Sequence, residues 1–395
     1  MNKYIKYHLT EYTAALLFFL MLRPYFTWRV SHILIMVPLF LVLLPHVSIR
    51  EKGNSYLLPM FFAILCIVPI MHGSSMNTFL GYVMFSIIPF LKKSFALNTF
   101  KVFRDLLAVV TAVSLLVWFY VIVFHNDLHY TIIAPFNSLK SYNYLSFPFL
   151  VVPQILDGPM SGFRFCGLFD EPGAIGTYSL LILYIENFNF KKWYNVIYLI
   201  AGAASFSLFF YVGLGFFLLL RVFTIKEQKK YRYWVVGGVL LLYVGTQTVP
   251  ILKDMIGVRL EYDEDRKKFV GDNRSSEELD EYIVSIRGTN AYAWGDRQEV
   301  AESFNRSASI KNAILRYGMV FIVFFFIFYF LYARKHLKGH KAEIALFIVL
   351  LLLTLYQRPG FVSPAYLFLF SIVVLVRSEA ISARRKIVRN QLSTC

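Results

Sequence analysis

One short segment combines a cation, glycines and two carboxylates in an order that suits phosphate chemistry. Residues 164–173 read Arg-Phe-Cys-Gly-Leu-Phe-Asp-Glu-Pro-Gly, and an apolar run follows. The guanidinium of Arg164 can bind a phosphate through two hydrogen bonds. Pro172 favours the first turn of a helix, whose N-terminus attracts anions. Asp170 and Glu171 suit that N-terminus electrostatically, so the segment also fits simple helix capping with Arg164 paired to one of them.

Further arginines lie in polar segments closer to the C-terminus. Arg274 and Arg287 flank an expected helix within residues 251–312, and Arg358 lies in a short turn between two apolar runs. Several arginines around a diphosphate would stabilise negative charge that develops there during a reaction. Each one is equally explained as a solvated or snorkelling surface residue.

The elements that must position these residues are membrane-spanning helices. Hydrophobic residues make up 57% of the 395 residues, and the mean hydropathy is +0.57. Soluble proteins average about 45–50% apolar residues. We therefore expect an all-α polytopic membrane protein, one integral membrane domain over residues 1–395, with about 12 transmembrane helices. The apolar runs lie near residues 12–28, 30–47, 56–71, 77–91, 105–124, 173–188, 193–206, 207–223, 233–250, 313–333, 342–357 and 361–376.

The distribution of charge orients these spans. With twelve spans both termini share one face, and that face holds 24 of the 40 Lys and Arg but only 7 of the 24 acids. Basic residues gather in short cytoplasmic connections, so the N- and C-termini are expected in the cytoplasm. The net charge of +16 then reflects topology and anionic lipid rather than a nucleic-acid partner. If residues 193–223 formed one helix instead of two, every later connection would change sides. The charge pattern therefore favours two short helices that meet near Ala204–Ser207.

Two large polar loops, residues 125–172 and 251–312, then fall on the extracytoplasmic face. In the first loop, the run 144–155 is too short to span a membrane, so it is expected to lie at the interface or to re-enter. The loop is rich in aromatic residues, which fit an interfacial aromatic belt or stacking on sugar rings: Tyr130, Tyr142, Tyr144 and Phe147.

The second loop is expected to form a small helical cap. Ser275 and Glu278 have capping-box spacing, and Leu279, Ile283 and Ile286 would then share one face. Gly288 suits the end of that helix. Asp296 begins a second, similar pattern.

No metal, cofactor or disulfide framework is expected. His125 and His129 are four residues apart, but no third ligand has suitable spacing. The three cysteines, Cys66, Cys166 and Cys395, fall in a span, an outer loop and the cytoplasmic tail.

Three segments resemble the bacterial O-antigen polymerase and ligase superfamily. The first is Arg164-x-x-Gly167 with Asp170-Glu171-Pro172 at the start of a span. The second is Ala204-Ser-Phe-Ser207 between two short spans. The third is the late loop, which carries Asn273-Arg274-Ser275, then Ser309-Ile-Lys-Asn312 and Leu315-Arg-Tyr-Gly318 before a span. With the topology, the resemblance covers most of the chain.

The resemblance implies a metal-independent glycosyltransferase of the bacterial inner membrane. Such a polymerase joins undecaprenyl-diphosphate-linked repeat units on the outer face of that membrane, in the making of O-antigen, capsule or exopolysaccharide. Arg164 and Arg274 would contact the diphosphate. Ligases often carry a histidine where this chain has Lys311, which favours a polymerase and adds Lys311 to the expected diphosphate contacts. Glu171, with Asp170 second, is the candidate general base.

Other functions fit the same topology. They are an O-antigen ligase or other lipid-linked glycosyltransferase, a flippase or secondary transporter, and a non-catalytic scaffold for polysaccharide export. A transporter would be favoured by an inverted pair of broken spans, which the sequence does not show. A chain-length regulator and a flippase are the expected protein partners, beside the lipid-linked donor and acceptor and membrane lipid.

Overall fold

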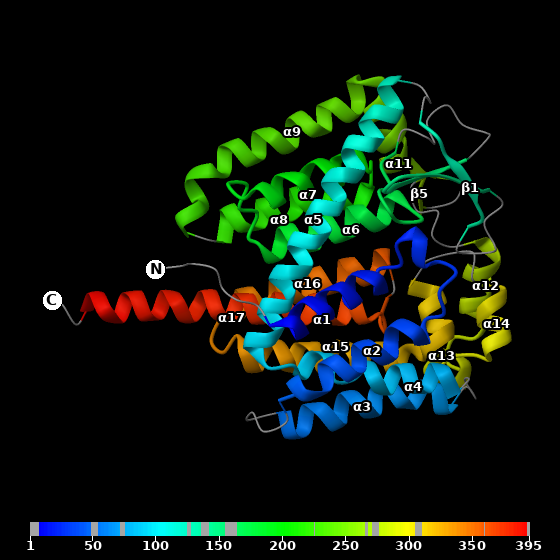
Figure 1. The fold of residues 1–395 in the computed structure, drawn as a ribbon, viewed down its shortest axis with the longest axis vertical. Coiled ribbons are helices and arrows are strands. Elements are labelled where there is room, and N and C mark those ends of the chain that lie inside the picture. Colours follow the sequence, from blue (N-terminus) through cyan, green and yellow to red (C-terminus); the bar gives the residue numbers. More distant parts are fainter. Residues whose placement is uncertain are drawn as a thin grey trace. The chain divides into compact units, whose positions relative to one another are not determined.

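The computed structural model describes residues 8–48, 54–71, 76–124, 128–135, 142–154, 164–224, 226–264, 268–270, 276–304, 310–358 and 360–392. Helices make up about 75% of the structure, which confirms the helical class. The chain divides into two compact units (Figure 1). That these units make one integral membrane domain stays a prediction.

The first unit contains residues 1–23, 29–106 and 277–395. Its core is aromatic: the rings of Phe61 and Phe328 stack at 4.0 Å, and those of Phe18 and Phe368 stack at 4.1 Å. Its elements are α1 (Leu9–Met21), α2 (Ile33–Leu43), η2 (Leu44–His46), α3 (Asn54–Met71), α4 (Met76–Phe85), η3 (Ile88–Phe90), the first part of α5 (Lys93–Phe124), α12 (Glu277–Ser285), α13 (Asn290–Trp294), α14 (Gln298–Ser303), α15 (Ile310–His336), α16 (Lys341–Gln357) and α17 (Pro364–Leu392).

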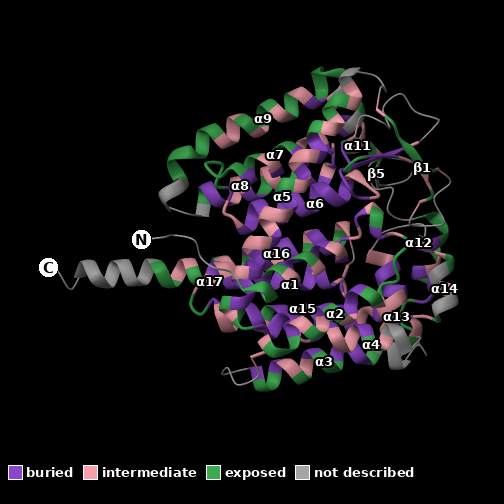
Figure 2. Ribbon diagram, viewed as in Figure 1, coloured by how far each residue is buried: buried purple, intermediate pink, exposed green. Residues whose placement is uncertain are grey.

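The second unit contains residues 24–28 and 107–276. It is built around α6, in which every residue from Gly173 to Ile185 is buried (Figure 2). Its elements are η1 (Tyr25–Thr27), the rest of α5, β1 (Thr131–Ile133), β2 (Tyr144–Phe147), β3 (Leu150–Pro153), α6 (Pro172–Ile185), α7 (Trp193–Ala204), α8 (Leu208–Thr224), η5 (Lys226–Tyr231), α9 (Arg232–Thr248), α10 (Pro250–Leu252), the π-helical turn η6 (Lys253–Gly257), α11 (Val258–Leu260), β4 (Tyr262–Asp263) and β5 (Lys268–Phe269).

Each of the twelve apolar runs contains a helix, and three of these helices are long and apolar enough to cross a membrane. These three are Lys93–Ile122, Ile310–His336 and Pro364–Ala383. Seven shorter apolar helices accompany them in the described part of the chain. The structure therefore supports a membrane protein, while twelve crossings and the orientation of the termini stay predictions.

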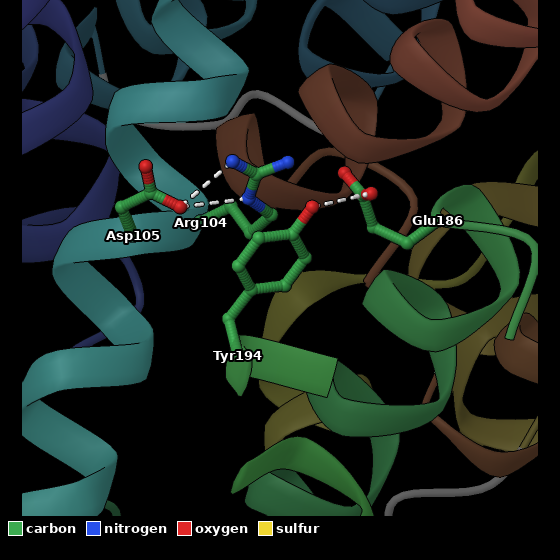
Figure 3. A network of polar contacts seen from close by, with 4 residues as sticks. All are labelled: Arg104, Asp105, Glu186 and Tyr194. Atoms are coloured by element: carbon green, nitrogen blue, oxygen red, sulfur yellow. Dashed lines mark hydrogen bonds and ion pairs between the residues drawn. The ribbon is translucent and has the colours of Figure 1, made fainter. Parts of the chain in front are cut away.

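The expected break between residues 193 and 223 is present. Helix α7 ends at Ala204 and α8 begins at Leu208, with Phe206 in the left-handed region at φ 47°. In the first turn of α7, the Tyr194 hydroxyl donates to Glu186 Oε2, just after α6, at 3.0 Å (Figure 3). In α5, Arg104 pairs with its neighbour Asp105 at 2.8 Å (Figure 3). Both are local pairs between polar residues close together in the sequence.

The first loop contains a small sheet that the all-α prediction did not include. Strands β1, β2 and β3 pair antiparallel in that order, and β2 and β3 form a hairpin over most of the run 144–155. Ser114 of α5 donates a hydrogen bond of 2.5 Å to the carbonyl of Phe149 at the hairpin tip. The run is thus a buried hairpin against an apolar helix, and its depth in a membrane stays a prediction.

The second loop forms short helices as expected. Leu279, Ile283 and Ile286 are buried along α12, and Gly288 follows at φ 84°. Ser275 of the expected capping box lies outside the described residues. A two-stranded ribbon of β4 and β5 was not expected in this loop.

Candidate functional site

Two of the sequence segments meet in the second unit through the side chain of Arg164 and the backbone of Phe165. Its Nε donates to the carbonyl of Ser205 at 3.1 Å, and its Nη2 donates to the carbonyl of Phe206 at 3.2 Å. The amide of Phe165 also donates to the carbonyl of Ala204 at 3.0 Å. These carbonyls follow the last turn of α7, where the helix leaves acceptors without partners of its own. The bonds therefore set the direction of the Arg164 guanidinium.

The start of α6 lies against the same turn. A Cβ added at Gly176 would lie 2.6 Å from Cβ of Ser207, so only glycine allows this close approach. Glu171 is the N-cap residue of α6, yet its side chain accepts no hydrogen bond from the helix's first turn. Capping by the Glu171 carboxylate is therefore not what the structure shows. Pro172 occupies the first turn, as expected.

Asp170 is held through its backbone. The hydroxyl of Tyr144 donates to the carbonyl of Asp170 at 2.5 Å, and Tyr144 is fully buried. Burial raises the pKa of Tyr144, and the nearby Tyr142 and Asp170 raise this pKa further. The hydroxyl consequently stays protonated and keeps donating this bond at ordinary pH.

Aromatic residues from a distant part of the chain surround Tyr144. Tyr144 packs with Val151 and Cys166 in a buried cluster, and partly buried residues cover it. The Trp28 ring lies edge-on to Tyr144 with centroids 5.0 Å apart, and the Tyr142 ring lies 5.5 Å away. The partly buried residues are Tyr25, Trp28, Ile133 and Tyr142.

This part of the second unit can bind and orient a phosphorylated ligand. An arginine is fixed by neutral backbone acceptors, and a carboxylate follows seven residues later at the start of a helix. Fixed cations stabilise charge that develops on a phosphate leaving group, and a carboxylate can accept a proton from an attacking hydroxyl.

A second polar cluster lies in the first unit, near the start of α15. Asn312 is buried, and its side-chain Nδ2 donates to the backbone carbonyl of Phe304 at 2.9 Å. Nε of Arg316 donates to the side-chain Oδ1 of Asn312 at 3.2 Å. Arg316 also donates to the hydroxyl of Tyr317, which accepts a further bond from Tyr82. The late sequence segment thus forms its own hydrogen-bonded group.

The cap is joined to α15 close to this cluster. Lys311 pairs with Asp280 of α12 at 2.6 Å. The amide of Asp296 donates to the carbonyl of Leu315 at 2.7 Å, and the hydroxyl of Tyr282 donates to Asp296 Oδ2 at 2.6 Å. The expected diphosphate contact Lys311 therefore has its charge offset by a carboxylate in this arrangement.

The remaining expected contacts are dispersed. Arg287 is exposed at the end of α12, and Arg358 follows the last residue of α16. Arg274 lies outside the described residues, as does His125. Arg164, Asp170 and Glu171 belong to the second unit, whereas Arg287, Lys311 and Arg358 belong to the first.

Sequence reasoning missed the aromatic residues at 25–28. Residues 12–28 read as one apolar span, whereas α1 ends at Met21. Pro24 was the available signal, because the residue before a proline disfavours helix; Arg23 has φ 61°. Asn312, Arg316 and Tyr317 fall within motifs that carry the resemblance, but the sequence alone indicated no role in a site for any of them.

No three His, Cys, Asp or Glu side chains in the described part of the chain are grouped to hold a metal ion. In comparisons with known proteins, no family model, no curated protein and no solved structure matches this chain.

Proposed function

We propose that this chain is a glycosyltransferase that polymerises polysaccharide repeat units carried on undecaprenyl diphosphate. The reaction takes place on the outer face of the bacterial inner membrane and yields O-antigen, capsule or exopolysaccharide. The observation that carries the proposal is the Arg164 guanidinium fixed on the carbonyls of Ser205 and Phe206, seven residues before Glu171. It supports the resemblance because two segments that resemble the superfamily are in contact.

The proposed reaction is a displacement at the anomeric carbon of the donor sugar. The bond from this carbon to the diphosphate oxygen breaks, and a bond to the acceptor hydroxyl oxygen forms. Undecaprenyl diphosphate leaves with the electron pair, and Arg164 stabilises its charge. Glu171 takes the proton of the acceptor hydroxyl, and Asp170 is the second candidate for this step. The roles of Arg274, Arg287, Lys311 and Arg358 as diphosphate contacts stay predictions from the sequence.

Removal of the gene and its replacement by variants test the proposal. Deletion is expected to abolish the ladder of surface glycan on a gel and to leave single repeat units on their anchor. An Arg164→Ala variant should behave like the deletion, and Arg164→Lys should restore little, because a lysine lacks the planar fork that meets both carbonyls. With purified protein, release of undecaprenyl diphosphate should fall about 10²–10³-fold.

A matched arginine separates catalysis from general charge effects. Arg232→Ala, at the exposed start of α9, should leave the ladder intact. Immunoblots of membranes and thermal unfolding in detergent show whether each variant is inserted and folded. An unchanged ladder in the deletion strain contradicts the proposal and favours transport. Polymer stranded on the lipid carrier would mean a ligase, and a folded Arg164→Ala variant with full activity would favour a scaffold.

A further inference from the structure

The aromatic residues around Tyr144 have no role in the reaction proposed above. We call Tyr25, Trp28, Tyr142 and Tyr144 the aromatic platform. Tyr144 is fully buried, and the other three residues are partly buried and pack against the cluster that contains it. Residues 24–28 belong to the second unit although their neighbours in the chain belong to the first. The fold therefore places two aromatic residues from 25–28 beside residues 142–144.

The platform is tied to the segment that carries Arg164 and Glu171. The amide of Tyr25 donates to the carbonyl of Leu168 at 2.8 Å. The hydroxyl of Tyr144 donates to the carbonyl of Asp170 at 2.5 Å, and the amide of Val151 donates to the carbonyl of Gly167 at 2.9 Å. A ligand on the platform is thus held at a fixed position relative to the candidate diphosphate contact and base.

The chemistry of these rings fits a sugar. The face of an aromatic ring carries partial negative charge, which attracts the slightly positive C–H groups on one face of a pyranose. Trp28 and Tyr142 are held at 5.0 Å and 5.5 Å from a buried ring, so little freedom is lost on binding.

We propose that the aromatic platform binds the glycan part of the lipid-linked repeat unit by stacking on its sugar rings. This inference rests on the proposed function, because it names a sugar subsite beside the same Arg164 and Glu171. Sugar is favoured over lipid because the Tyr144 ring and the backbone of Tyr25 are fixed by hydrogen bonds to the Arg164–Glu171 segment, which membrane-interface aromatics do not need.

Direct binding tests the platform without the reaction. The probe is a phosphate-free oligosaccharide obtained by partial acid hydrolysis of the source strain's surface polysaccharide. Its affinity for the purified full-length protein in detergent is measured by calorimetry. Trp28→Ala is expected to weaken binding at least 10-fold, and Tyr142→Ala should act in the same direction. The matched control is Trp234→Ala in α9, where the side chain is 82% exposed and affinity should not change.

Several outcomes decide between the ideas. Equal affinity of the wild type and Trp28→Ala, or no binding by the wild type, overturns the platform. The platform is also overturned, and these rings become interfacial anchors, if brominated lipid quenches the emission that Trp28→Phe removes and the oligosaccharide gives no protection. Trp28→Phe keeps a ring and should recover part of the affinity, which excludes misfolding as the cause.

The proposed function is judged separately, by polymerisation. If the chain is a polymerase and the platform binds its substrate, Trp28→Ala should raise the KM for lipid-linked repeat units about 10-fold, with a smaller change in kcat. If the wild type binds oligosaccharide through Trp28 but forms no polymer, the polymerase proposal fails and the platform stands. If polymerisation is active and Trp28→Ala leaves its KM unchanged, the platform fails and the polymerase proposal stands.

Discussion

Two adjacent carboxylates, Asp170 and Glu171, are held differently. Asp170 contributes its backbone carbonyl to a buried bond from Tyr144, and Glu171 is the N-cap of a buried helix without capping it through its side chain. Glu171 stands at the start of α6 and stays the first candidate for the proton acceptor of the proposed reaction, with Asp170 second.

Isosteric amides test this assignment. Glu171→Gln removes the base without changing shape, and polymerisation by the purified protein should fall about 10²–10⁴-fold. Asp170→Asn keeps the backbone carbonyl that Tyr144 uses, so its loss should be smaller. A larger loss in Asp170→Asn than in Glu171→Gln would reverse the two roles.

Tyr144 is expected to contribute stability in a pH-dependent way. Burial raises the pKa of Tyr144, so its folded-state pKa exceeds the unfolded value of about 10. Below pH 10 both states are protonated and the contribution is fully present. As the pH rises above about 10, only the unfolded chain loses the proton, so stability falls.

The measurement is thermal unfolding in detergent between pH 7 and pH 11. Tyr144→Phe should lose about 1–3 kcal/mol at pH 7, because the variant leaves a buried carbonyl without its donor. It should also show a shallower decline above pH 10. Tyr130→Phe, at a residue that is 42% exposed, serves as the control and should match the wild type.

Among the helices of the first unit, α15 contains a break in its helical backbone. Helix α15 is interrupted at Gly318, where φ is 78° and ψ is 156°. A Cβ there would lie 2.4 Å from the carbonyl oxygen of Ala293. The backbone of α13 therefore approaches α15 at the interruption, and the Asp296–Leu315 bond lies beside it. The cap is attached to α15 through this close approach.

Gly318→Ala should consequently loosen the cap. The left-handed backbone and the clash together should cost about 2–5 kcal/mol. Limited proteolysis should then cut within residues 277–304 sooner than in the wild type. Gly237→Ala in α9 is the matched control, since nothing lies within 4 Å of its added Cβ. That change should stabilise the helix by about 0.5–1 kcal/mol, and equal effects of both changes would contradict this account.

Elements with strong local signals could be predicted from the sequence. The apolar spacing of Leu279, Ile283 and Ile286, followed by a glycine, identified α12, and charge identified the α7–α8 break. The hairpin of β2 and β3 could not be separated from an interfacial segment, because short apolar runs lack a distinguishing period. The hydrogen-bond partners of Arg164 could not be predicted for another reason. Ser205 and Phe206 lie 41 and 42 positions later in the sequence, and no local sequence pattern indicates such a contact.

For the whole molecule, the membrane character rests on three long apolar helices and on charge asymmetry. Orientation can be tested with single introduced cysteines in a Cys395→Ser background and a membrane-impermeant maleimide, because Cys66 and Cys166 are buried. Arg287→Cys should react in intact spheroplasts, whereas Lys229→Cys should react only after the membrane is permeabilised. The reverse pattern would place the cap in the cytoplasm and remove the basis for a lipid-linked donor.

The position of residues 24–28 also has a consequence for biogenesis. They join the second unit, and the Tyr25 hydroxyl bonds to the carbonyl of Phe147, 122 positions later in the chain. At about 5–20 residues per second of synthesis, this bond has no acceptor for roughly 6–24 s after Tyr25 is made. The turn between α1 and α2 is therefore synthesised well before its partners, and translation itself sets the earliest moment at which the second unit can close.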